Sequence, residues 1–410
     1  MEAITLHSDC KQQIHQTQFL YGKDVQQSVG PLLREQKANS VLVLCGIEAL
    51  RRTGWYKQML QSLRQTKLTF WELGGIEYQA QLEQIETGIA LCKKQQVDYI
   101  LAVGGGSVID SAKAIAMGAL CDQCIWSYFT TKQRPEAALP VSVLLTIPGS
   151  GSENNDQAMI TNDDTLLKLS CRSAVLQPQY CLINPEIFYT ISQEQLAHAT
   201  VMILHRMICD YLLRCRQGAD QKQLKRLEEG MRLLMRKARQ LQTNRFDDDA
   251  WNQLVLLDSR RDTALETGKQ EDSCQRMAAE LSSMCQVPYG AVLAVLLPAW
   301  MQFISQKNQQ ELMTFSQNVM GISAELPAET QISEGIMGLQ KFFWELQLAD
   351  NLCALGIQQF CFKNIAQICT GYGWGQERPS GVLQTLYWQD LYQIYQSVYR
   401  QPVLEELYPA

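Results

Sequence analysis

The clearest pattern of hydrophobic and polar positions lies in residues 97–116, VDYILAVGGGSVIDSAKAIA. An apolar run ends at three glycines, as expected for a strand covered on both faces, and helical spacing then predicts a helix that opens at Ser107. Such a helix start offers unpaired backbone N–H groups to an anion, and glycines let a pyrophosphate approach the main chain. The pattern predicts a phosphate-binding turn, although a tight turn without a ligand would need the same glycines.

The rest of the N-terminal half repeats this alternation. Apolar runs predict strands at 40–46, 68–73 and 141–147, and helical spacing predicts helices at 55–63 and 80–95. Strands that alternate with helices indicate an α/β fold with a parallel sheet covered on both faces. Ligands bind such sheets at the carboxyl ends of the strands, where Gly46, Gly104 and Thr146 fall.

The pattern changes to helices after residue 185, which predicts an α/β domain over 1–185 and an all-α domain over 186–410. Ser192 and Gln195 form a capping box at the start of the first long helix. A glycine-rich loop is expected at 371–381. Helices are expected at 192–213, 221–242, 248–257, 272–285, 291–304, 333–348 and 385–399.

Composition narrows the function classes. A chain of 410 residues fits two domains, and a net charge of -6 argues against a general nucleic-acid or anionic-membrane surface. Without a secretory signal or an apolar run long enough to cross a bilayer, the protein is expected to be cytoplasmic and not membrane-bound. The 14 scattered cysteines fit reduced thiols, and no zinc or redox role is predicted for the isolated pair Cys121 and Cys124.

The string GGGSVIDSAKAIA at 104–116 closely resembles a fingerprint of the iron-dependent (group III) alcohol dehydrogenases, and residues 145–164, LTIPGSGSENNDQAMITNDD, resemble the second fingerprint of that family. The likeness covers nearly the whole chain and is strongest to the NADPH-linked butanol-dehydrogenase branch. It implies a Rossmann-like domain followed by a helical domain, the dehydroquinate synthase-like or iron alcohol dehydrogenase fold. It also implies a homodimer that acts on a small alcohol or aldehyde with NAD(P).

The resemblance implies a set of cofactor-binding residues at the matching positions. They are Gly46, Glu48, Gly104, Gly105, Gly106, Ser107, Asp110, Thr146, Ser150 and Lys168. Family members have a glycine-rich turn where this chain has Gly46-Ile47-Glu48-Ala49. A carboxylate at Glu48 would repel the 2′-phosphate of NADP and accept a hydrogen bond from the free ribose of NAD, which predicts NAD over NADP. The alternative is that Glu48 pairs with Arg51 or Arg52 and meets no ligand.

In the family, an aspartate and three histidines bind one divalent metal, which polarises the alcohol oxygen. Carrying these ligands over implies that they fall at Met202, Arg206, Gln275 and Tyr289, none of which is a carboxylate or an imidazole. A guanidinium repels a cation, and a thioether, an amide and a neutral phenol are poor ligands for iron or zinc. The divalent metal is therefore expected to be absent.

A relocated metal site is not expected either. The chain has only four histidines, His7, His15, His198 and His205, and the last two are separated by about two helical turns, roughly 10 Å. His205 is expected to be a surface residue or a core residue with a partner.

The resemblance and the substitutions leave two hypotheses of function. The first is an NAD(P)-dependent alcohol or aldehyde oxidoreductase that lacks the metal, with Tyr289 as proton donor and Lys168 as its electrostatic partner. In that hypothesis Arg206 could polarise a carbonyl, but a structural ion pair is the expected role. The second is a catalytically inactive family member that acts as a nucleotide-binding or protein-interaction subunit, in which Tyr289 is only a packed aromatic residue.

Overall fold

The computed structural model divides the chain into two compact units, Met1–Ile191 and Ser192–Ala410. The sequence pattern changes after residue 185, whereas this division falls after Ile191, because Ile187 of the short helix that follows belongs to the hydrophobic core of the first unit. The structure describes residues 16–46, 48–76, 79–131, 133–165, 167–259, 272–371 and 379–399, without the side chains of 48 and 49.

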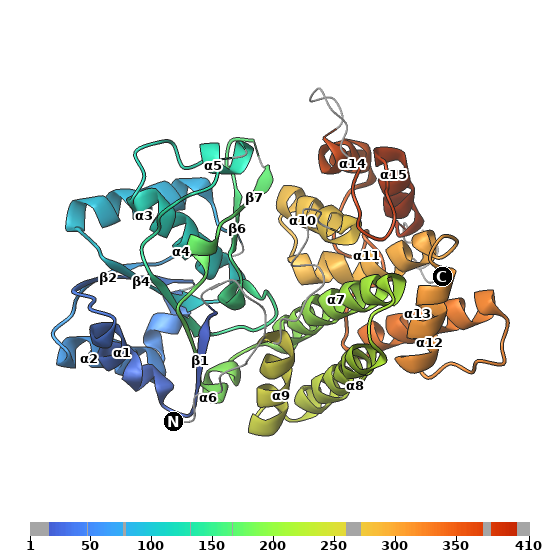
Figure 1. Ribbon diagram of the computed structural model, residues 1–410, viewed down its shortest axis with the longest axis horizontal. Coiled ribbons are helices and arrows are strands. Elements are labelled where there is room, and N and C mark those ends of the chain that lie inside the picture. The colour runs from blue at the N-terminus through green and yellow to red at the C-terminus, as the bar shows by residue number, and fades with distance from the viewer. Residues whose placement is uncertain are drawn as a thin grey trace, which may run out of the picture. The chain divides into compact units, whose positions relative to one another are not determined.

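A six-stranded parallel sheet forms the centre of the first unit (Figure 1). The expected strands at 40–46, 68–73, 97–103 and 141–147 are all present, with bounds that differ by one to three residues. Two strands of four residues each, an edge strand and its neighbour, were not predicted, because an apolar run this short carries little signal. In spatial order the strands are β1 (Gln18–Tyr21), β8 (Tyr180–Ile183), β5 (Val141–Leu145), β4 (Tyr99–Gly104), β2 (Ser40–Cys45) and β3 (Thr69–Leu73).

Helices cover both faces of this sheet, as the alternation of elements predicts (Figure 1). Side chains alternate along each strand, so Val41, Val43 and Leu101 point to one face, where they pack in a core with helices α1 and α2. Helices α3 and α4 pack against each other, and α4 packs against β4. The bounds are α1 (Val29–Glu35), α2 (Gly54–Gln65), α3 (Leu82–Gln95) and α4 (Gly106–Ala119).

A separate antiparallel hairpin, β6 (Gln157–Thr161) and β7 (Lys168–Arg172), packs on α4. The fully buried Lys113 of α4 holds it there, because its ammonium group donates to the carbonyl oxygens of Asn155 and Gln157 at 2.7 and 2.9 Å. The unit is completed by the short helices η1 (Val25–Ser28), η2 (Glu48–Arg52), α5 (Ser127–Thr130), η3 (Ser152–Asn154), η4 (Ala174–Leu176) and α6 (Pro185–Phe188).

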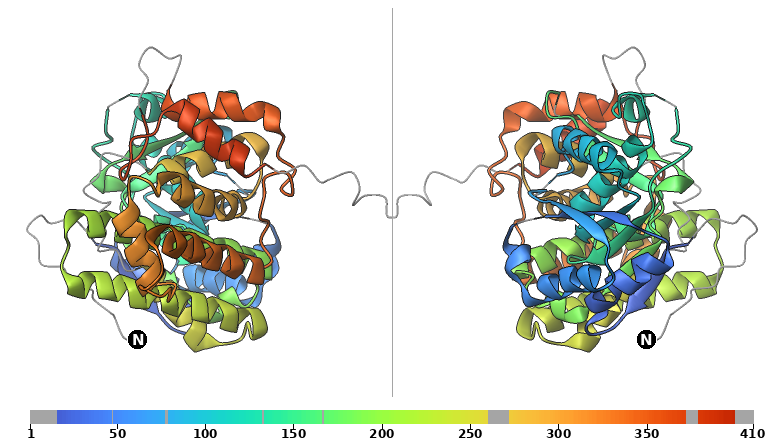
Figure 2. Two further views of the ribbon diagram at one scale, coloured as in Figure 1. Left: turned by 90° about the vertical axis from the view of Figure 1, so that its right-hand side faces the viewer. Right: turned by 90° about the vertical axis from the view of Figure 1, so that its left-hand side faces the viewer.

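The described part of the second unit is built from helices, as predicted. The left view of Figure 2 shows these helices in front. The capping box of Ser192 and Gln195 opens the first helix, and Gly290 lets α11 pack closely on α7 at His198. Its helices are α7 (Gln193–Gln217), α8 (Gln221–Thr243), α9 (Asp248–Ser259), α10 (Ser273–Cys285), α11 (Tyr289–Ile304), α12 (Gln309–Asn318), α13 (Ala328–Glu345), η6 (Gln359–Cys361), α14 (Phe362–Thr370) and α15 (Trp388–Ser397). Most of the loop predicted at 371–381 lies outside the described residues.

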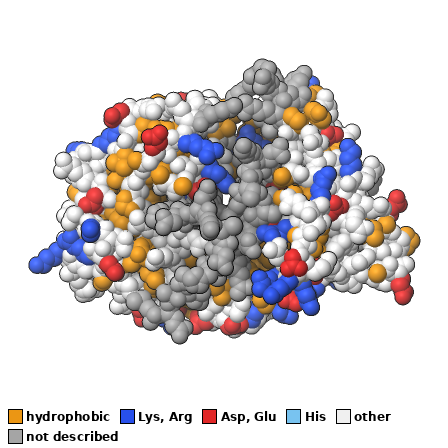
Figure 3. Space-filling model, in the orientation of Figure 1, with side chains coloured by type: hydrophobic (Ala, Val, Ile, Leu, Met, Phe, Trp, Pro, Cys, Tyr) orange, Lys and Arg blue, Asp and Glu red, His pale blue; other side chains and the backbone are white. Residues whose placement is uncertain are grey.

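Helix α7 is long and apolar enough by composition to cross a membrane, which differs from the expectation that no such segment exists. However, 78% of its most apolar window is buried inside the protein, which is typical of the core helix of a soluble protein. On the face shown in Figure 3, acidic and basic side chains of the described residues are interspersed and not separated by sign.

Candidate functional site

The carboxyl edge of the sheet has a switch point between β2 and β4. The connection after β2 leads to its neighbour β3 on one side, whereas the connection after β4 leads to its neighbour β5 on the other side. Cys45 pairs with Val103, and Gly104 with Leu145, so Gly46, Gly105 and Thr146 follow their strands at the same edge. Open α/β sheets bind ligands at such a point.

Helix α4 begins at this edge. Gly105 is the N-cap residue, and as a glycine it has no side chain with which to cap the first turn. The N–H groups of a first turn have no partner within the helix, and with the helix dipole they favour an anion. The start of α4 can therefore hold a phosphate group.

The three glycines at this turn have different reasons to be glycine. A Cβ at Gly104 would lie 2.4 Å from Cγ2 of Val108, and one at Gly106 would lie 2.6 Å from Cβ of Ser150, so packing requires both. A Cβ at Gly105 would meet only ordinary contacts, at 3.4 Å or more, and its backbone is extended with φ of -95°. Neither packing nor backbone geometry requires glycine at 105, which is expected where a ligand approaches the main chain.

Polar groups gather beside this turn. Ser152 and the backbone N–H of Met159 hydrogen-bond the carboxylate of Asp110, and the charges of Lys113 and Lys168 lie near it. Burial nevertheless raises the pKa of Asp110 to about 6, against the lowering effect of these partners. Asp110 therefore carries a proton over a wider pH range than an exposed aspartate.

The structure thus brings most of the predicted cofactor-binding residues to one corner of the first unit. The backbone of Glu48 lies in η2, but its side chain is outside the described residues. Of its two suggested partners, Arg51 lies 3.8 Å from Glu72 and donates to the sulfur of Cys45 at 3.4 Å. The residues at the corner are Gly46, Gly104, Gly105, Gly106, Ser107, Asp110, Thr146, Ser150 and Lys168.

In the second unit, the four positions implied as metal ligands are all partly exposed. Arg206 forms an ion pair with Asp258, whose side chain is fully buried. Arg206 therefore has the structural role expected for it. Its guanidinium and the side chains of Met202, Gln275 and Tyr289 offer no carboxylate or imidazole, so these residues do not fit a divalent iron or zinc ion.

Tyr289, the predicted proton donor, opens α11 near Asp272 and Arg206. Desolvation by surrounding protein groups raises the pKa of its phenol well above the usual value, the charge of Asp272 adds to this, and Arg206 opposes it. Tyr289 keeps its proton at neutral pH and can donate a hydrogen bond. Lys168, its suggested partner, lies in the first unit, so that pairing stays a prediction.

A second group of side chains lies directly beside these four positions and is buried. His205 Nε2 lies 3.1 Å from Oδ2 of Asp272 and 3.4 Å from the sulfur of Cys209. Cys274 belongs to the same group, because its sulfur lies within 4.8 Å of the His205 and Asp272 ligand atoms. His205 is therefore a core histidine with a partner, one of the two roles expected for it.

Charges within this group shift the pKa of several members. Burial would raise the pKa of Asp272, but the charge and hydrogen bond of His205 and the backbone N–H groups of Gln275 and Cys274 lower it overall. Burial and the charge of Asp272 raise the pKa of the Cys209 and Cys274 thiols well above the usual value. The expectations from sequence missed Asp272 and Cys274 because they considered only histidines. The available signals were the i, i+4 pair His205 and Cys209 and the Asp-Ser-Cys run at 272–274.

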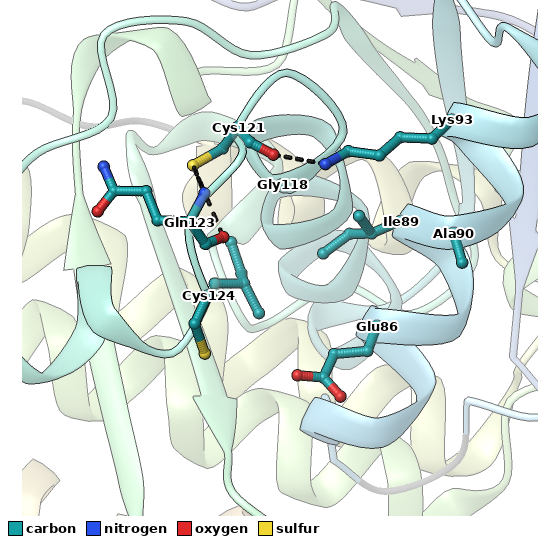
Figure 4. Close-up of a pocket in the computed structure, with 9 residues that line it drawn as sticks. Glu86, Ile89, Ala90, Lys93, Gly118, Cys121, Gln123 and Cys124 are labelled. Atoms are coloured by element: carbon teal, nitrogen blue, oxygen red, sulfur yellow. Dashed lines mark hydrogen bonds between the residues drawn. The ribbon is translucent and has the colours of Figure 1, made fainter.

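The Cys121 and Cys124 pair lines a shallow pocket of about 280 Å³ between α3 and the end of α4 (Figure 4). Lys93 donates to the carbonyl oxygen of Cys121 at 2.5 Å, and the backbone N–H of Gln123 donates to the sulfur of Cys121 at 3.3 Å. Both cysteines are free of disulfides. Among the described residues, the group of side chains with metal-binding geometry does not include either of them.

The fold defines the class to which this protein belongs. The crystal structure of NADH-dependent butanol dehydrogenase A from Thermotoga maritima superposes with a TM-score of 0.86, at 25% identity, over 98% of this chain and 99% of that chain. The protein therefore has the fold of the iron-containing alcohol dehydrogenases, as the sequence resemblance implies.

Family models then give the membership. Residues 16–185 match the model of iron-containing alcohol dehydrogenase, and residues 228–399 match the C-terminal model of the same family. The chain belongs to the iron-containing alcohol dehydrogenase family. This confirms the resemblance to that family seen in the sequence.

Two curated relatives illustrate the activities found among similar proteins. NADH-dependent butanol dehydrogenase A of Clostridium acetobutylicum is 26% identical over 344 residues, which cover 83% of this chain and 88% of that protein. The NADPH-dependent aldehyde reductase YqhD of Escherichia coli is 28% identical over 349 residues, which cover 83% of this chain and 88% of that protein. The similar butanol dehydrogenases therefore include NADH-dependent ones, whereas the resemblance pointed to an NADPH-linked branch.

Proposed function

We propose that this protein is an NAD(P)-dependent oxidoreductase of small alcohols or aldehydes that works without a divalent metal at the four family ligand positions. The observation that carries the proposal is the corner of the first unit, where the glycine N-terminus of α4 meets the switch point of the sheet. Glycine at 105 has no structural reason there except room for a ligand. Family membership and the dehydrogenases and reductase among its relatives supply the reaction class.

In this proposal the corner holds the pyrophosphate on the first turn of α4. When bound, the nicotinamide supplies the hydride in the reduction of an aldehyde. Tyr289 donates its phenol proton to the carbonyl oxygen as the hydride reaches the carbonyl carbon, and solvent returns a proton to the phenolate. Like any phenol, Tyr289 is protonated at neutral pH, as a general acid must be before the reaction, and its raised pKa makes it a weaker acid than an exposed tyrosine.

We propose that the chain prefers NAD to NADP, because the sequence has an acidic residue, Glu48, three positions after the end of β2 at Cys45. The test is a titration of the purified protein with NAD⁺, NADH, NADP⁺ and NADPH, read as binding heat and as melting temperature. A ligand at a hundred times its Kd stabilises the folded state by about 2.7 kcal/mol, so NAD and NADH should raise the melting temperature most. Equal shifts for all four nucleotides would overturn the preference, and no shift would overturn the nucleotide site.

Catalysis is tested separately, as oxidation of NADH by a panel of short aldehydes in the presence of a chelator. The proposal expects turnover that the chelator does not change and that Tyr289→Phe lowers by about 10²-fold, the range of a general acid. Nucleotide binding should be unchanged in this variant. Equal turnover of Tyr289→Phe and the unaltered protein would remove Tyr289 from the mechanism.

The alternative is a catalytically inactive member that binds nucleotide or a protein partner. The observation in its favour is that Arg206, at one of the four positions, is engaged with Asp258 and not presented to a substrate. Nucleotide binding without aldehyde reduction would support this alternative. We also propose a homodimer, as the family resemblance implies, and light scattering of the eluting protein measures the mass directly.

A further inference from the structure

We propose that His205, Cys209, Asp272 and Cys274 form a closed, buried site for Zn²⁺ that fastens helix α10 to helix α7. These residues are not the four positions matched to the family ligands. The ion would therefore be a structural one in a new place, and the expected absence of a divalent metal would hold for the catalytic ion only. The proposal does not depend on nucleotide binding.

Two helices bring the four side chains together. His205 and Cys209 are separated by one turn of α7, which puts them on the same face. Asp272 is the N-cap of α10 and Cys274 lies in its first turn. Their exposed fractions are 2% for His205, 2% for Cys209, 5% for Asp272 and 0% for Cys274, so all four belong to the interior. A pair of ligands from each of two elements is a common way to build a zinc site.

The distances suit a tetrahedral ion. Zinc bonds of about 2.0 to 2.3 Å, arranged tetrahedrally, separate the ligand atoms by about 3.4 to 3.8 Å. His205 Nε2 lies 3.1 Å from Asp272 Oδ2 and 3.4 Å from the Cys209 sulfur. The ligand atoms of His205, Asp272 and Cys274 all lie within 4.8 Å of one another. For His205, Asp272 and Cys274, changes of about 1 Å or less in each distance give zinc geometry. Cys209 contacts this group at His205 and Asp272.

Without an ion, hydrogen bonds join these groups, because His205 Nε2 lies against Asp272 and the Cys209 thiol contacts both His205 and Asp272. An ion at their centre contacts every member at once. Asp272 is also oriented for this role, because its Oδ1 accepts the backbone N–H of Gln275 at 3.0 Å while Oδ2 faces His205. Such a hydrogen bond to the second oxygen fixes a ligating carboxylate.

The donor set selects the metal. Two sulfurs, one imidazole and one carboxylate suit the borderline-soft Zn²⁺ and disfavour Mg²⁺ and Ca²⁺, which prefer oxygen ligands. Binding breaks the S–H bond of each thiol, forms two zinc–sulfur bonds and releases the two protons to solvent. With four protein ligands no coordination position stays open for a substrate, so the site is structural and does not restore metal catalysis.

The first experiment measures metal in the intact protein, expressed with added zinc and purified without chelator. We expect about one zinc per chain by elemental mass spectrometry, and a loss of about ten-fold or more in Cys274→Ala and Cys209→Ala. Two controls should keep the metal. Cys92→Ala removes a buried thiol of the first unit, and Gln275→Ala removes a side chain beside the site but keeps the backbone N–H. A zinc-free protein, or equal zinc in all variants, would overturn the proposal.

The second experiment does not require a variant to fold. The metal of the unaltered protein is replaced by Co²⁺, and the visible and near-ultraviolet spectrum is recorded. Thiolate ligands should give sulfur-to-cobalt charge-transfer absorption, and tetrahedral cobalt should give intense ligand-field bands in the visible. A weak octahedral spectrum without charge transfer would show that Co²⁺ binds elsewhere and would contradict the assignment.

Discussion

The carboxyl edge of the sheet in the first unit and the α7–α10 region of the second unit differ in how their polar groups are satisfied. At the sheet edge, α4 begins with a glycine as its N-cap, and Gly105 leaves room above the backbone. In the helical unit, Arg206 is paired with Asp258, and His205 with Asp272. The first region has room for a ligand beside its backbone, whereas charged side chains of the second region are paired with one another.

Two kinds of site therefore depend on side chains to different degrees. A phosphate cradle depends on backbone N–H groups and on small residues, so it tolerates most changes in side-chain chemistry elsewhere. A metal centre depends on the donor atoms of a few side chains, and replacing them changes its chemistry at once. The predictions that follow separate these two kinds of dependence.

The largest effect is expected for Arg206→Met in the second unit. This variant leaves the buried carboxylate of Asp258 without its guanidinium partner, and such a loss costs about 3 kcal/mol. Urea unfolding followed by circular dichroism measures the change in unfolding free energy. The matched variant Arg206→Met with Asp258→Asn removes both charges and should recover much of the loss. A single variant as stable as the unaltered protein would show that the pair is not structural.

The sequence predicted the elements that carry strong patterns and missed the weak ones. The strand before Gly104 and the helix after it are fixed by an apolar run and by helical spacing, and both were predicted. Helix α12, QQELMTFSQN, was missed because its apolar positions are few, and α13 starts earlier than predicted because its first turn is polar. These local failures do not change the fold, because the sheet and the long helices determine the packing.

The candidate site could be predicted only where it follows the chain. The glycine turn is continuous in sequence, so its position at the sheet edge was predictable, but the sequence does not distinguish Gly105 from the glycines that packing requires. The buried group of His205, Cys209, Asp272 and Cys274 was not predicted. It joins two helices that are far apart in the chain, and only their packing brings the ligand atoms within reach.

A smaller effect separates the roles of two neighbouring glycines. Gly104→Ala should destabilise the fold by about 2 kcal/mol, because the added Cβ overlaps Val108. Gly105→Ala should leave stability within about 0.5 kcal/mol but weaken NAD binding by about ten-fold, because the added methyl group occupies space that the ligand uses. Denaturant unfolding and calorimetric titration measure the two quantities. Unchanged affinity in Gly105→Ala would mean that the ligand does not approach this turn.

The last effect is a pH dependence of the unfolding free energy, which the raised pKa of Asp110 causes. Its pKa is about 6 in the folded protein, above the ordinary value of 3.8, because burial outweighs the favourable charges of Lys113 and Lys168. Between these two values the folded state binds more protons than the unfolded state, so the unfolding free energy should fall as pH rises from about 4 to 6. The expected change is on the order of 1–3 kcal/mol.

Chemical unfolding at a series of pH values measures this contribution. Asp110→Asn should remove the fall between pH 4 and 6, whereas Asp164→Asn, at an exposed position of the same unit, should retain it. A bound pyrophosphate adds negative charge near Asp110, which favours the protonated carboxyl group, so saturating NAD should move the fall to higher pH. If NAD raises stability equally at every pH, the phosphates bind away from Asp110, and the proposed placement at the start of α4 is wrong.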